Sequence, residues 1–350
     1  MRIGVLTGGG DCPGLNAAIR AIVLDAQRRG SEVVGLLEGW RGAIEGNSRP
    51  ITSEDVHGIL RRGGTILRTS RTNPFRSPES LEQLLTTWKT LGLDALIAIG
   101  GEDTLGVAER LHREQGIPVV GVPKTIDNDL AATDYTFGFD TAVSIATDAI
   151  DRLHTTAESH NRVMVVEVMG RHAGWIATHA GIAGGADFIA IPERPTQVEE
   201  ISGAIRQRAD AGRGFSIIVV AEGAQIEGLE ASGHSKLDDF GHELLGGIAQ
   251  RLAGALEERT GFETRVTVLG HVQRGGTPTA YDRVLATRYG ILASELVHRG
   301  AFGKMASLSG AEIIAVDLED AVAQAKTVPP ELSQLAAIVS RLPGAGEIAR

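Results

Sequence analysis

Two stretches of the sequence decide the fold: Leu93-Asp94-Ala95-Leu96-Ile97-Ala98-Ile99-Gly100-Gly101-Glu102-Asp103-Thr104 and Ile117-Pro118-Val119-Val120-Gly121-Val122-Pro123-Lys124-Thr125-Ile126-Asp127-Asn128-Asp129. Each contains an apolar run of strand length that ends in Gly or Pro and is followed by acidic residues. Such runs are typical of buried parallel strands. Because ligands of open α/β sheets bind at the carboxyl edge of the strands, we expect the acidic side chains and Lys124 to gather at one ligand site.

Length and composition indicate a globular protein with more than one core. The 350 residues exceed one ordinary core, so two domains are expected. Hydrophobic residues make up 42% of the chain and charged residues 22%, as in soluble proteins. Glycine contributes 45 residues, which predicts many tight turns and close backbone approaches to a ligand.

Charge and cysteine content exclude several classes of partner. The net charge of −10 disfavours binding to nucleic acid. Cys12 has no second cysteine to pair with, so a reducing, cytoplasmic location is expected. The glycine-rich N-terminus leaves no room for the apolar core of a signal peptide, and no apolar run reaches about 18 residues, so we expect no membrane span.

A glycine-rich segment near the N-terminus predicts an anion site. An apolar strand from Ile3 to Thr7 is followed by Gly8-Gly9-Gly10-Asp11-Cys12-Pro13-Gly14-Leu15-Asn16 and by a helical pattern from Ala17 to Arg28. A glycine turn at a helix N-terminus offers backbone N–H groups and the positive end of the helix dipole to an anion. The spacing fits neither the Walker motif nor Gly-x-Gly-x-x-Gly, and a tight turn without a ligand explains this stretch equally well on its own.

An arginine-bearing turn follows. The strand Val33–Leu37 and the amphipathic helix Pro78–Leu91 flank a glycine-led turn that carries Arg68 and Arg71. Arginine can bind phosphate oxygens bidentately, so Arg71 is a candidate phosphate ligand, although loop arginines are more commonly only solvated.

The second half repeats this α/β pattern. Arg162 precedes a buried strand that ends in Met169-Gly170-Arg171. Aromatic residues beside Gly138 indicate a crossing between domains. Three histidines lie near one another in sequence, His160, His172 and His179, but they lack Cys or carboxylate partners at ligand spacing and are predicted to be structural. The remaining expected elements are a helix to residue 160, strands at 188–191 and 215–221, a polar loop at 228–239, helices at 243–259 and 282–298, a short strand followed by a glycine turn within residues 264–278, and a partly helical tail from residue 317.

Charged residues of both signs flank the predicted strands. The carboxylates are Asp11, Glu102, Asp103, Asp127, Asp129 and Glu222, and the cations are Arg71, Lys124, Arg162, Arg171, Arg265, His271 and Arg274. Carboxylates suit a metal ion and arginines suit a phosphate. Together they suit Mg²⁺-assisted phosphoryl transfer, in which positioning and charge neutralisation do most of the catalysis. Surface ion pairs would explain any one of these residues, but not so many at turn-flanked strand ends.

Five motifs resemble those of the phosphofructokinase family, over about residues 1–304. They are Gly-Gly-Gly-Asp-Cys-Pro-Gly-Leu-Asn at 8–16, Gly-Gly-Glu-Asp-Thr at 100–104, Pro-Lys-Thr-Ile-Asp-Asn-Asp at 123–129, Met-Gly-Arg at 169–171 and Gly-His-Val-Gln-Arg-Gly-Gly at 270–276. The resemblance implies phosphorylation of fructose 6-phosphate at its 1-hydroxyl, with Asp127 as the catalytic base. It also implies that Thr125 and Asp129 flank the transferring phosphoryl group and that Arg171 stabilises its charge.

The same resemblance implies the binding sites and the assembly. Gly9, Gly10 and Arg71 match the donor-phosphate loop, and Glu102 matches a carboxylate that binds Mg²⁺. The sugar-phosphate site is matched by Arg162, Met169, Gly170, Glu222, Arg265, His271 and Arg274. In the family, Arg162 and Arg265 reach in from a neighbouring subunit, which implies a homo-oligomer with shared active sites.

The implied fold is α/β, with two Rossmann-like three-layer domains, mostly parallel sheets and the active site in the cleft between them. We expect a phosphoryl-donor domain of residues 1–138 plus about 273–323, and a sugar-phosphate domain of residues 139–272 plus about 324–350.

Asp103 and Lys124 decide the phosphoryl donor. Family members that use ATP carry glycine at both positions, whereas members that use pyrophosphate carry Asp and Lys. A carboxylate at Asp103 would face the α-phosphate of a nucleotide, and two like charges about 4 Å apart repel by about 4 kcal/mol at an effective dielectric near 20. Since about 1.4 kcal/mol is a tenfold change, ATP would be disfavoured by roughly a thousandfold. Lys124 supplies a cation for the compact pyrophosphate.

The favoured interpretation is a Mg²⁺-dependent phosphofructokinase that uses pyrophosphate reversibly. The alternatives are an ATP-dependent phosphofructokinase that tolerates Asp103, a non-catalytic sensor of sugar phosphates and, more remotely, a dinucleotide oxidoreductase. Retention of Asp127 and Glu102 disfavours a sensor. ATP-using relatives place two arginines along the first helix for an effector nucleotide; here Arg20 is present but Asp25 stands in the next turn, so nucleotide regulation is not expected.

Overall fold

The computed structural model describes residues 1–229 and 246–340. These residues form two compact units: unit 1 contains residues 1–141 and 274–325, and unit 2 contains residues 142–229, 246–273 and 326–340. Helix α5 (Phe139–His160) begins in unit 1 and continues into unit 2. Within the described ranges, no helix is both long enough and apolar enough to cross a bilayer.

Unit 1 is built on an eight-stranded sheet. Its strands are β1 (Arg2–Thr7), β2 (Glu32–Leu36), β3 (Ser48–Ile51), β4 (Ala95–Gly100), β5 (Val119–Thr125), β6 (Phe137–Gly138), β13 (Lys304–Ser309) and β14 (Glu312–Asp317). The order is β14-β13-β5-β4-β1-β2-β3, with β6 beside β5. The inner strands are parallel, whereas β3 and β14 run antiparallel to their neighbours. The apolar runs of β4 and β5 are buried, as expected for central parallel strands.

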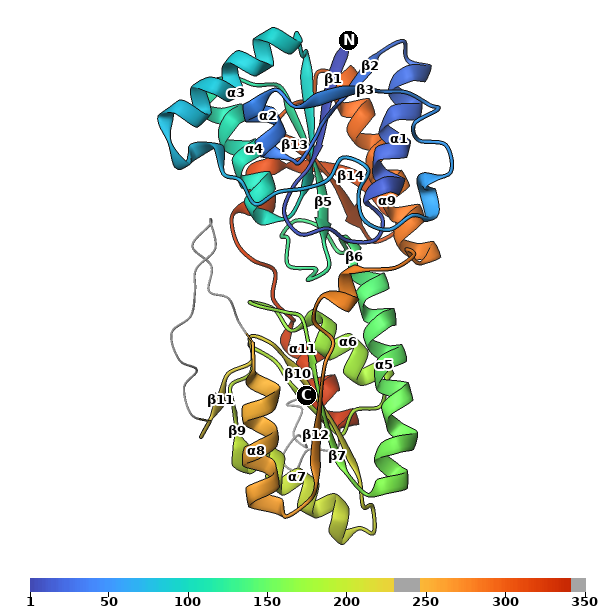
Figure 1. Ribbon diagram of the computed structural model, residues 1–350, viewed down its shortest axis with the longest axis vertical. Helices are drawn as coiled ribbons and strands as arrows, with labels where there is room; N and C mark the ends of the chain where they lie inside the picture. Colours follow the sequence, from blue (N-terminus) through green and yellow to red (C-terminus); the bar gives the residue numbers. More distant parts are fainter. Residues whose placement is uncertain (230–245, 341–350) are drawn as a thin grey trace. The chain divides into compact units, whose positions relative to one another are not determined.

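Helices cover both faces of this sheet (Figure 1). The helices of unit 1 are α1 (Leu15–Arg28), α2 (Trp40–Glu45), α3 (Pro78–Leu91), α4 (Glu102–Gln115), α9 (Ala280–His298) and α10 (Leu318–Val322), with the 3₁₀ turns η1 (Ile59–Arg61) and η2 (Pro74–Arg76). α1 and α9 pack together on one face, and α2, α3, α4 and α10 lie on the other.

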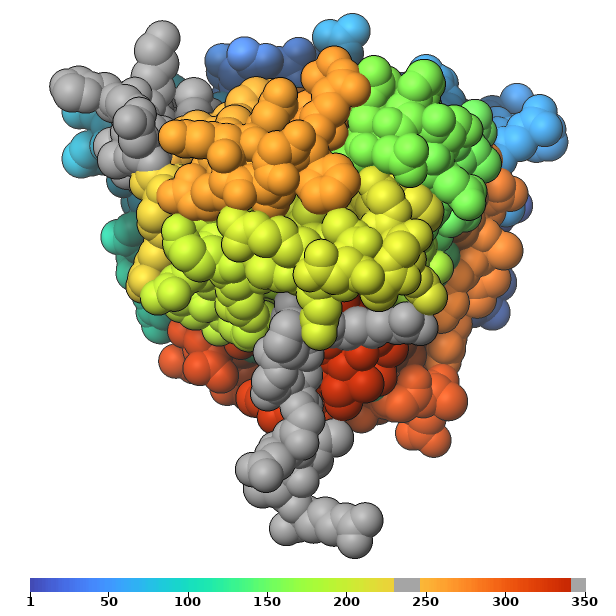
Figure 2. All heavy atoms as spheres, turned by 90° about the horizontal axis from the view of Figure 1, so that it is seen from below, coloured from blue at the N-terminus to red at the C-terminus, as the bar shows by residue number. Residues whose placement is uncertain are grey.

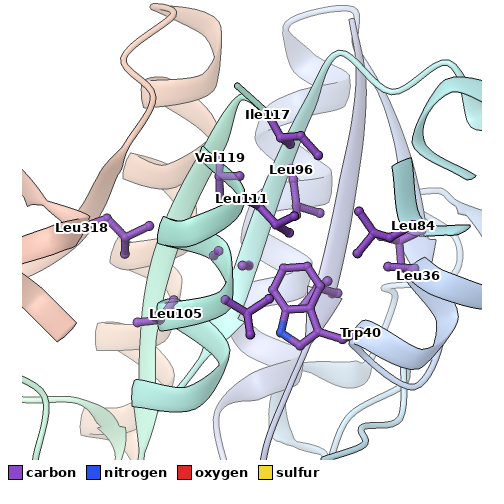
Figure 3. Close-up of a cluster of buried hydrophobic side chains, with 14 of the residues drawn as sticks. Leu36, Trp40, Leu84, Leu96, Leu105, Leu111, Ile117, Val119 and Leu318 are labelled. Atoms are coloured by element: carbon purple, nitrogen blue, oxygen red, sulfur yellow. The ribbon is translucent and has the colours of Figure 1, made fainter. Parts of the chain in front are cut away.

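A hydrophobic cluster fills the space between the sheet and the second group of helices (Figure 3). Trp40 of α2 and Leu84 of α3 lie in it beside Leu96 of β4. Leu105 of α4 is fully buried in the same cluster. Because Leu105 lies in the first turn of α4, its packing fixes the N-terminus of this helix at the carboxyl end of β4.

Unit 2 is a smaller α/β unit. Its four-stranded sheet has the order β12-β7-β10-β8, and all its pairs are parallel. The strands are β7 (Val163–Val168), β8 (Phe188–Ala190), β10 (Ser216–Ala221) and β12 (Thr264–Val268), with a separate pair β9 (Thr196–Gln197) and β11 (Ile226–Glu227). The other elements are α6 (Trp175–Ala183), α7 (Val198–Asp210), α8 (Ile248–Thr260), α11 (Pro330–Val339) and the 3₁₀ turn η3 (Gly270–Arg274). α8 packs against β12 and β7, and α6 packs against β10 and β8.

The expected α/β class is confirmed, and most expected elements lie within two residues of the observed ones. The helix expected at 243–259 is wrong at its start, because α8 begins only at Ile248. Gly247 precedes it with φ 78°, in the left-handed region outside a right-handed helix. Residues 243–245 of that helix and residues 230–239 of the expected polar loop lie outside the described residues.

A buried carboxylate joins the N-termini of α5 and α9. Asp282 of α9 is fully buried and accepts hydrogen bonds from the backbone N–H (2.8 Å) and the hydroxyl (2.5 Å) of Thr141 in α5. Thr279 accepts the backbone N–H of Asp282 at 3.2 Å and donates to Asp140 at 2.6 Å. Burial raises the pKa of Asp282 to about 6; the hydrogen bonds from Thr141 oppose this rise, and the charge of Asp140 adds to it.

This pKa predicts how stability depends on pH. In the unfolded chain the pKa of Asp282 returns to 3.8, so the folded state binds the extra proton between about pH 4 and pH 6. The free energy of unfolding therefore falls as pH rises through this window. Asp282→Asn removes the penalty, and its amide oxygen can take the place of Oδ2 as the acceptor from Thr141, so the variant should gain up to about 3 kcal/mol over the wild type between pH 4 and pH 7.

Urea denaturation of both proteins at several pH values measures this difference. Asp320→Asn, an exposed change on α10, is the control and should not reproduce the gain in stability. A constant difference for Asp282→Asn would contradict the prediction.

Candidate active site

The carboxyl ends of three strands lie next to one another at one edge of the unit 1 sheet. Thr7 of β1 pairs with Ile99 of β4, and Gly100 pairs with Pro123 of β5. Strand order changes direction at β1, because β2 lies on one side of it and β4 on the other. Open α/β sheets bind ligands at such a point. Eight predicted site residues belong to this edge: Gly9, Gly10, Glu102, Asp103, Lys124, Thr125, Asp127 and Asp129.

The glycine loop after β1 is held by the turn that carries Arg71. The backbone N–H of Gly9 donates to the carbonyl of Ser70 at 3.3 Å. The hydroxyl of Thr69 donates to the carbonyl of Gly9 at 2.6 Å. These two bonds bring the exposed Arg71 beside the loop, as its predicted role in donor binding requires.

Arg274 lies against the same loop. A Cβ atom added to Gly10 would be 2.2 Å from Nη1 of Arg274, so only glycine allows this approach. Arg274 was predicted to bind the sugar phosphate. In the structure it belongs to unit 1 and contacts the glycine loop, which is the predicted donor-phosphate loop and is called the donor loop below.

Lys124 lies beneath the loop and is buried, with 3% of its surface exposed. Its ammonium donates to the carbonyl of Gly10 at 2.6 Å. Burial lowers the pKa of Lys124, and the charge of Arg274 lowers it further, while Cys12, Asp11 and Asp127 act in the opposite direction. An anion bound at the loop would favour the charged ammonium.

Cys12 faces the interior of unit 1. Its thiol is 1% exposed and donates to the carbonyl of Phe137 at 3.6 Å. Burial raises the pKa of the thiol well above its usual range. Cys12 therefore packs the donor loop and presents no thiolate.

The N-terminus of α4 carries the two carboxylates that follow β4. Glu102 and Asp103 form the first turn of this helix. Glu102 is exposed and Asp103 is partly buried. A helix N-terminus attracts anions, and here the protein's own carboxylates already supply the negative charge.

The turn after β5 holds Asp127 and Asp129 on either side of a buried asparagine. Asn128 is 1% exposed and has a φ of 51°, in the left-handed region that Asn tolerates. Its Oδ1 accepts the backbone N–H of Thr136 at 3.0 Å. The backbone N–H of Asp127 donates to the hydroxyl of Thr125 at 3.0 Å. The turn is thus fixed by its own side chains.

In unit 2 the predicted sugar-phosphate residues divide into two groups. Met169, Gly170 and Arg171 follow β7, Glu222 follows β10, and His271 follows β12. Since these strands are parallel neighbours, the five residues lie at the carboxyl edge of one sheet.

Arg162 and Arg265 lie at the opposite edge. Arg162 immediately precedes β7, and Arg265 is the second residue of β12. Both bind Glu263: Nε of Arg162 is 2.7 Å from its carboxylate, and Arg265 forms a second ion pair with it. Figure 2 views this amino edge, where the segments around residues 160 (green) and 260 (orange) lie side by side. Within one chain the sheet separates these arginines from Arg171.

Comparison with known proteins identifies the family. The sequence profile of the phosphofructokinase family matches residues 2–297. The chain belongs to the phosphofructokinase family. This result confirms the resemblance that the five motifs indicate.

Relatives named for either phosphoryl donor resemble the chain. Pyrophosphate--fructose 6-phosphate 1-phosphotransferase of Amycolatopsis methanolica is 61% identical over 333 residues, which cover 95% of this chain and 97% of that protein. ATP-dependent 6-phosphofructokinase 3 of Streptomyces coelicolor is 56% identical over 331 residues, covering 94% and 97%. Overall identity to relatives therefore separates the two donors only slightly.

A solved member of the family has the same fold. The structure of Pichia pastoris phosphofructokinase superposes with a TM-score of 0.82 at 32% sequence identity. The match covers 97% of this chain and 36% of the yeast chain, so this chain spans about a third of that protein's length.

Glu102 is the carboxylate that the family resemblance matches to a magnesium ligand. Among the described residues there is no cluster of three or more His, Cys, Asp or Glu side chains that could hold a metal ion. Mg²⁺ usually binds one or two carboxylates and completes its shell with phosphate oxygens and water. The exposed carboxylate of Glu102, beside the donor loop's sheet edge, fits that role.

Two buried polar residues were missed by sequence reasoning: Thr104 lies beside the glycine loop, and Asn16 holds residues 62–66. Thr104 is 3% exposed and packs against the backbone of Gly8 and Gly100, where an added Cβ would lie 2.4 and 2.3 Å from its side chain. Asn16 is fully buried; its amide donates to Arg62 O at 2.9 Å, and its Oδ1 accepts from Ile66 N at 2.9 Å. Both residues stand inside the quoted motifs, which is the signal that could have found them.

Proposed function

We propose that the chain transfers a phosphoryl group from pyrophosphate to the 1-hydroxyl of fructose 6-phosphate, giving fructose 1,6-bisphosphate and phosphate. The observation that carries the proposal is the Lys124 ammonium buried against Gly10 beneath the glycine loop. The family and the name of the relative from Amycolatopsis methanolica support it. The reaction is reversible because pyrophosphate and the sugar bisphosphate are similar phosphoryl donors, so it serves glycolysis and gluconeogenesis.

Asp127 acts as the base of this reaction. Its carboxylate accepts the proton of the 1-hydroxyl as that oxygen bonds to phosphorus. The turn around Asn128 holds the carboxylate in a fixed position, which such proton transfer needs. Thr125 and Asp129 flank the transferring phosphoryl group, and Arg171 stabilises its charge.

Two groups of residues bind the sugar phosphate, and they come from two copies of the chain. Met169, Gly170, Glu222, His271 and Arg274 bind it from the same chain as Asp127. Arg162 and Arg265 bind it from a second copy, because they lie at the opposite edge of their own sheet. Glu263 holds the two guanidinium groups together for this purpose. The active protein is therefore a homo-oligomer.

Charge selects the donor. The buried Lys124 ammonium interacts more strongly with phosphate than an exposed lysine would, since the surroundings have a low dielectric. Asp103 puts a negative charge in the first turn of α4, where it would repel the α-phosphate of a nucleotide. Gly9, Gly10 and Arg71 bind the two linked phosphates.

Glu102 would hold Mg²⁺ together with the donor phosphates, and the ion, when bound, would supply positive charge beside the transferring phosphoryl group. The protein acts in the cytoplasm, where a thiol such as Cys12 stays reduced.

Initial rates with the two donors test the proposal. At saturating fructose 6-phosphate and Mg²⁺, kcat/KM should be about a thousandfold higher for pyrophosphate than for ATP, from the repulsion at Asp103. A metal chelator should abolish the pyrophosphate reaction. Turnover with ATP and none with pyrophosphate would overturn the donor assignment and favour an ATP-dependent phosphofructokinase. Binding of fructose 6-phosphate without turnover with either donor would identify a sensor instead.

A further inference from the structure

Gln273 is a fully buried glutamine in the 3₁₀ turn η3, which follows β12. Its amide N–H donates to the carbonyl of Gly270 at 3.1 Å, and its amide oxygen accepts the backbone N–H of Met169 at 3.4 Å. One side chain thus links the segment after β12 to the segment after β7. None of the roles proposed above uses it.

Gln273 continues the sheet where backbone pairing stops. The last backbone bond between these two strands runs from Leu269 N to Glu167 O at 3.0 Å. Beyond it, Met169 N meets the glutamine oxygen in place of a backbone carbonyl. An amide is suited to this position because it carries both a donor and an acceptor.

The other side of the Met169–Arg171 segment is already fixed by backbone. Glu222 N donates to Val168 O at 2.9 Å, and Gly223 N donates to Gly170 O at 3.0 Å. The approach is so close that a Cβ on Gly223 would lie 1.9 Å from the carbonyl oxygen of Arg171. Gln273 is therefore a side-chain contact that holds this segment on its β12 side.

We propose that Gln273 is a positioning residue for the sugar-phosphate site. It contacts no substrate; it fixes Met169 on one strand end and the turn that carries His271 on the next. The inference rests on the proposed function, because Met169 and His271 are placed in the site by that proposal. Removing the amide leaves the buried N–H of Met169 and the part-buried carbonyl of Gly270 without their partner, so the two strand ends would separate to reach water.

Steady-state kinetics of Gln273→Met tests the inference. Methionine has a similar volume but no hydrogen-bond donor and only a weakly accepting sulfur. The KM for fructose 6-phosphate should rise about tenfold, and the KM for pyrophosphate should change by less than about twofold. Amide exchange at Met169 should also speed up, since its N–H loses its acceptor. Gln273→Glu keeps an acceptor for Met169 N–H but places a buried carboxylate against the Gly270 carbonyl, so it should raise the sugar-phosphate KM at least as much.

The matched control is Gln197→Met, because Gln197 is exposed and bonds only to the surface residue Glu227, at 3.3 Å, among the bonds described. It should leave both KM values and the Met169 exchange unchanged. Equal rises of both KM values in Gln273→Met, or unchanged KM values in a protein that melts at the wild-type temperature, would overturn the inference. A wild type without turnover would overturn the proposed function first, so the two failures are distinguishable.

Discussion

Replacing Asp127 with asparagine is expected to lower kcat with pyrophosphate by about 10²–10⁴-fold, the range that general bases contribute. The amide cannot accept the proton of the 1-hydroxyl, but its size and the surrounding turn are preserved. The bonds of Asn128 and Thr125 that hold the turn do not involve the Asp127 carboxylate. The KM for fructose 6-phosphate should therefore change by less than about twofold. Initial rates over a range of sugar-phosphate concentration measure both quantities.

The control for this variant is Asp94→Asn. Asp94 precedes β4 at the amino edge of the unit 1 sheet, where it accepts from the backbone of Arg2 at 2.7 Å. Its replacement should leave kcat unchanged. Asp127→Asn with near-wild-type turnover would remove Asp127 from the base role.

Asp127→Asn, mixed with a second inactive variant, also tests whether active sites are shared between subunits. Arg162→Ser/Arg265→Ser is expected to be inactive alone because its partner's site lacks both guanidinium groups. When the two inactive proteins are unfolded and refolded together in equal amounts, half of the sites contain an intact Asp127, and half of these receive intact arginines from a neighbouring copy. About a quarter of the wild-type activity per chain should therefore return. If no activity returns although mixed oligomers form, the two arginines do not act across subunits.

The second large effect is expected for Asp103→Gly/Lys124→Gly. Loss of the buried ammonium should lower kcat/KM for pyrophosphate by about 10²–10³-fold, the usual effect of removing a preorganised donor to a transferring group. Loss of the Asp103 carboxylate removes its repulsion of a nucleotide, so kcat/KM for ATP should rise. Rates with both donors, measured on the double variant and on each single variant, separate the two contributions.

Lys304→Met is the matched control for the lysine. Lys304 lies at the start of β13 in the same unit and pairs with Asp317 at 2.7 Å, near the surface. Its loss should leave the donor preference unchanged. If the double variant kept both the rate with pyrophosphate and the preference over ATP, charge in the donor pocket would not select the donor.

Much of the fold followed from the sequence because its central strands are buried on both faces. β4 and β5 are continuous apolar runs between glycine or proline, a pattern that a partly exposed strand does not produce. β13 and β14 were not anticipated. β14 is an exposed edge strand, and its weak alternation is harder to separate from a loop. The helix α2 was missed as well, because its six residues carry less than two turns of periodicity.

The candidate site was predictable only as far as it follows strand ends. Glu102, Lys124 and Asp127 lie where the rule for parallel sheets puts them, at one edge of one sheet. The contact of Arg274 with Gly10 joins positions 264 residues apart (274 − 10) and depends on tertiary packing that no local pattern reports. Arg162 and Arg265 were counted with the other charges that flank strands, but they lie at the amino edge of their sheet, opposite Arg171.

The inward orientation of Cys12 has a consequence for the conditions under which the donor loop can work. A sulfur that is sealed behind Phe137 and held as a neutral thiol reacts slowly with peroxides and alkylating agents, which attack thiolates. Oxidative stress that silences enzymes with an exposed, acidic cysteine should therefore leave this loop chemically intact for as long as the fold persists.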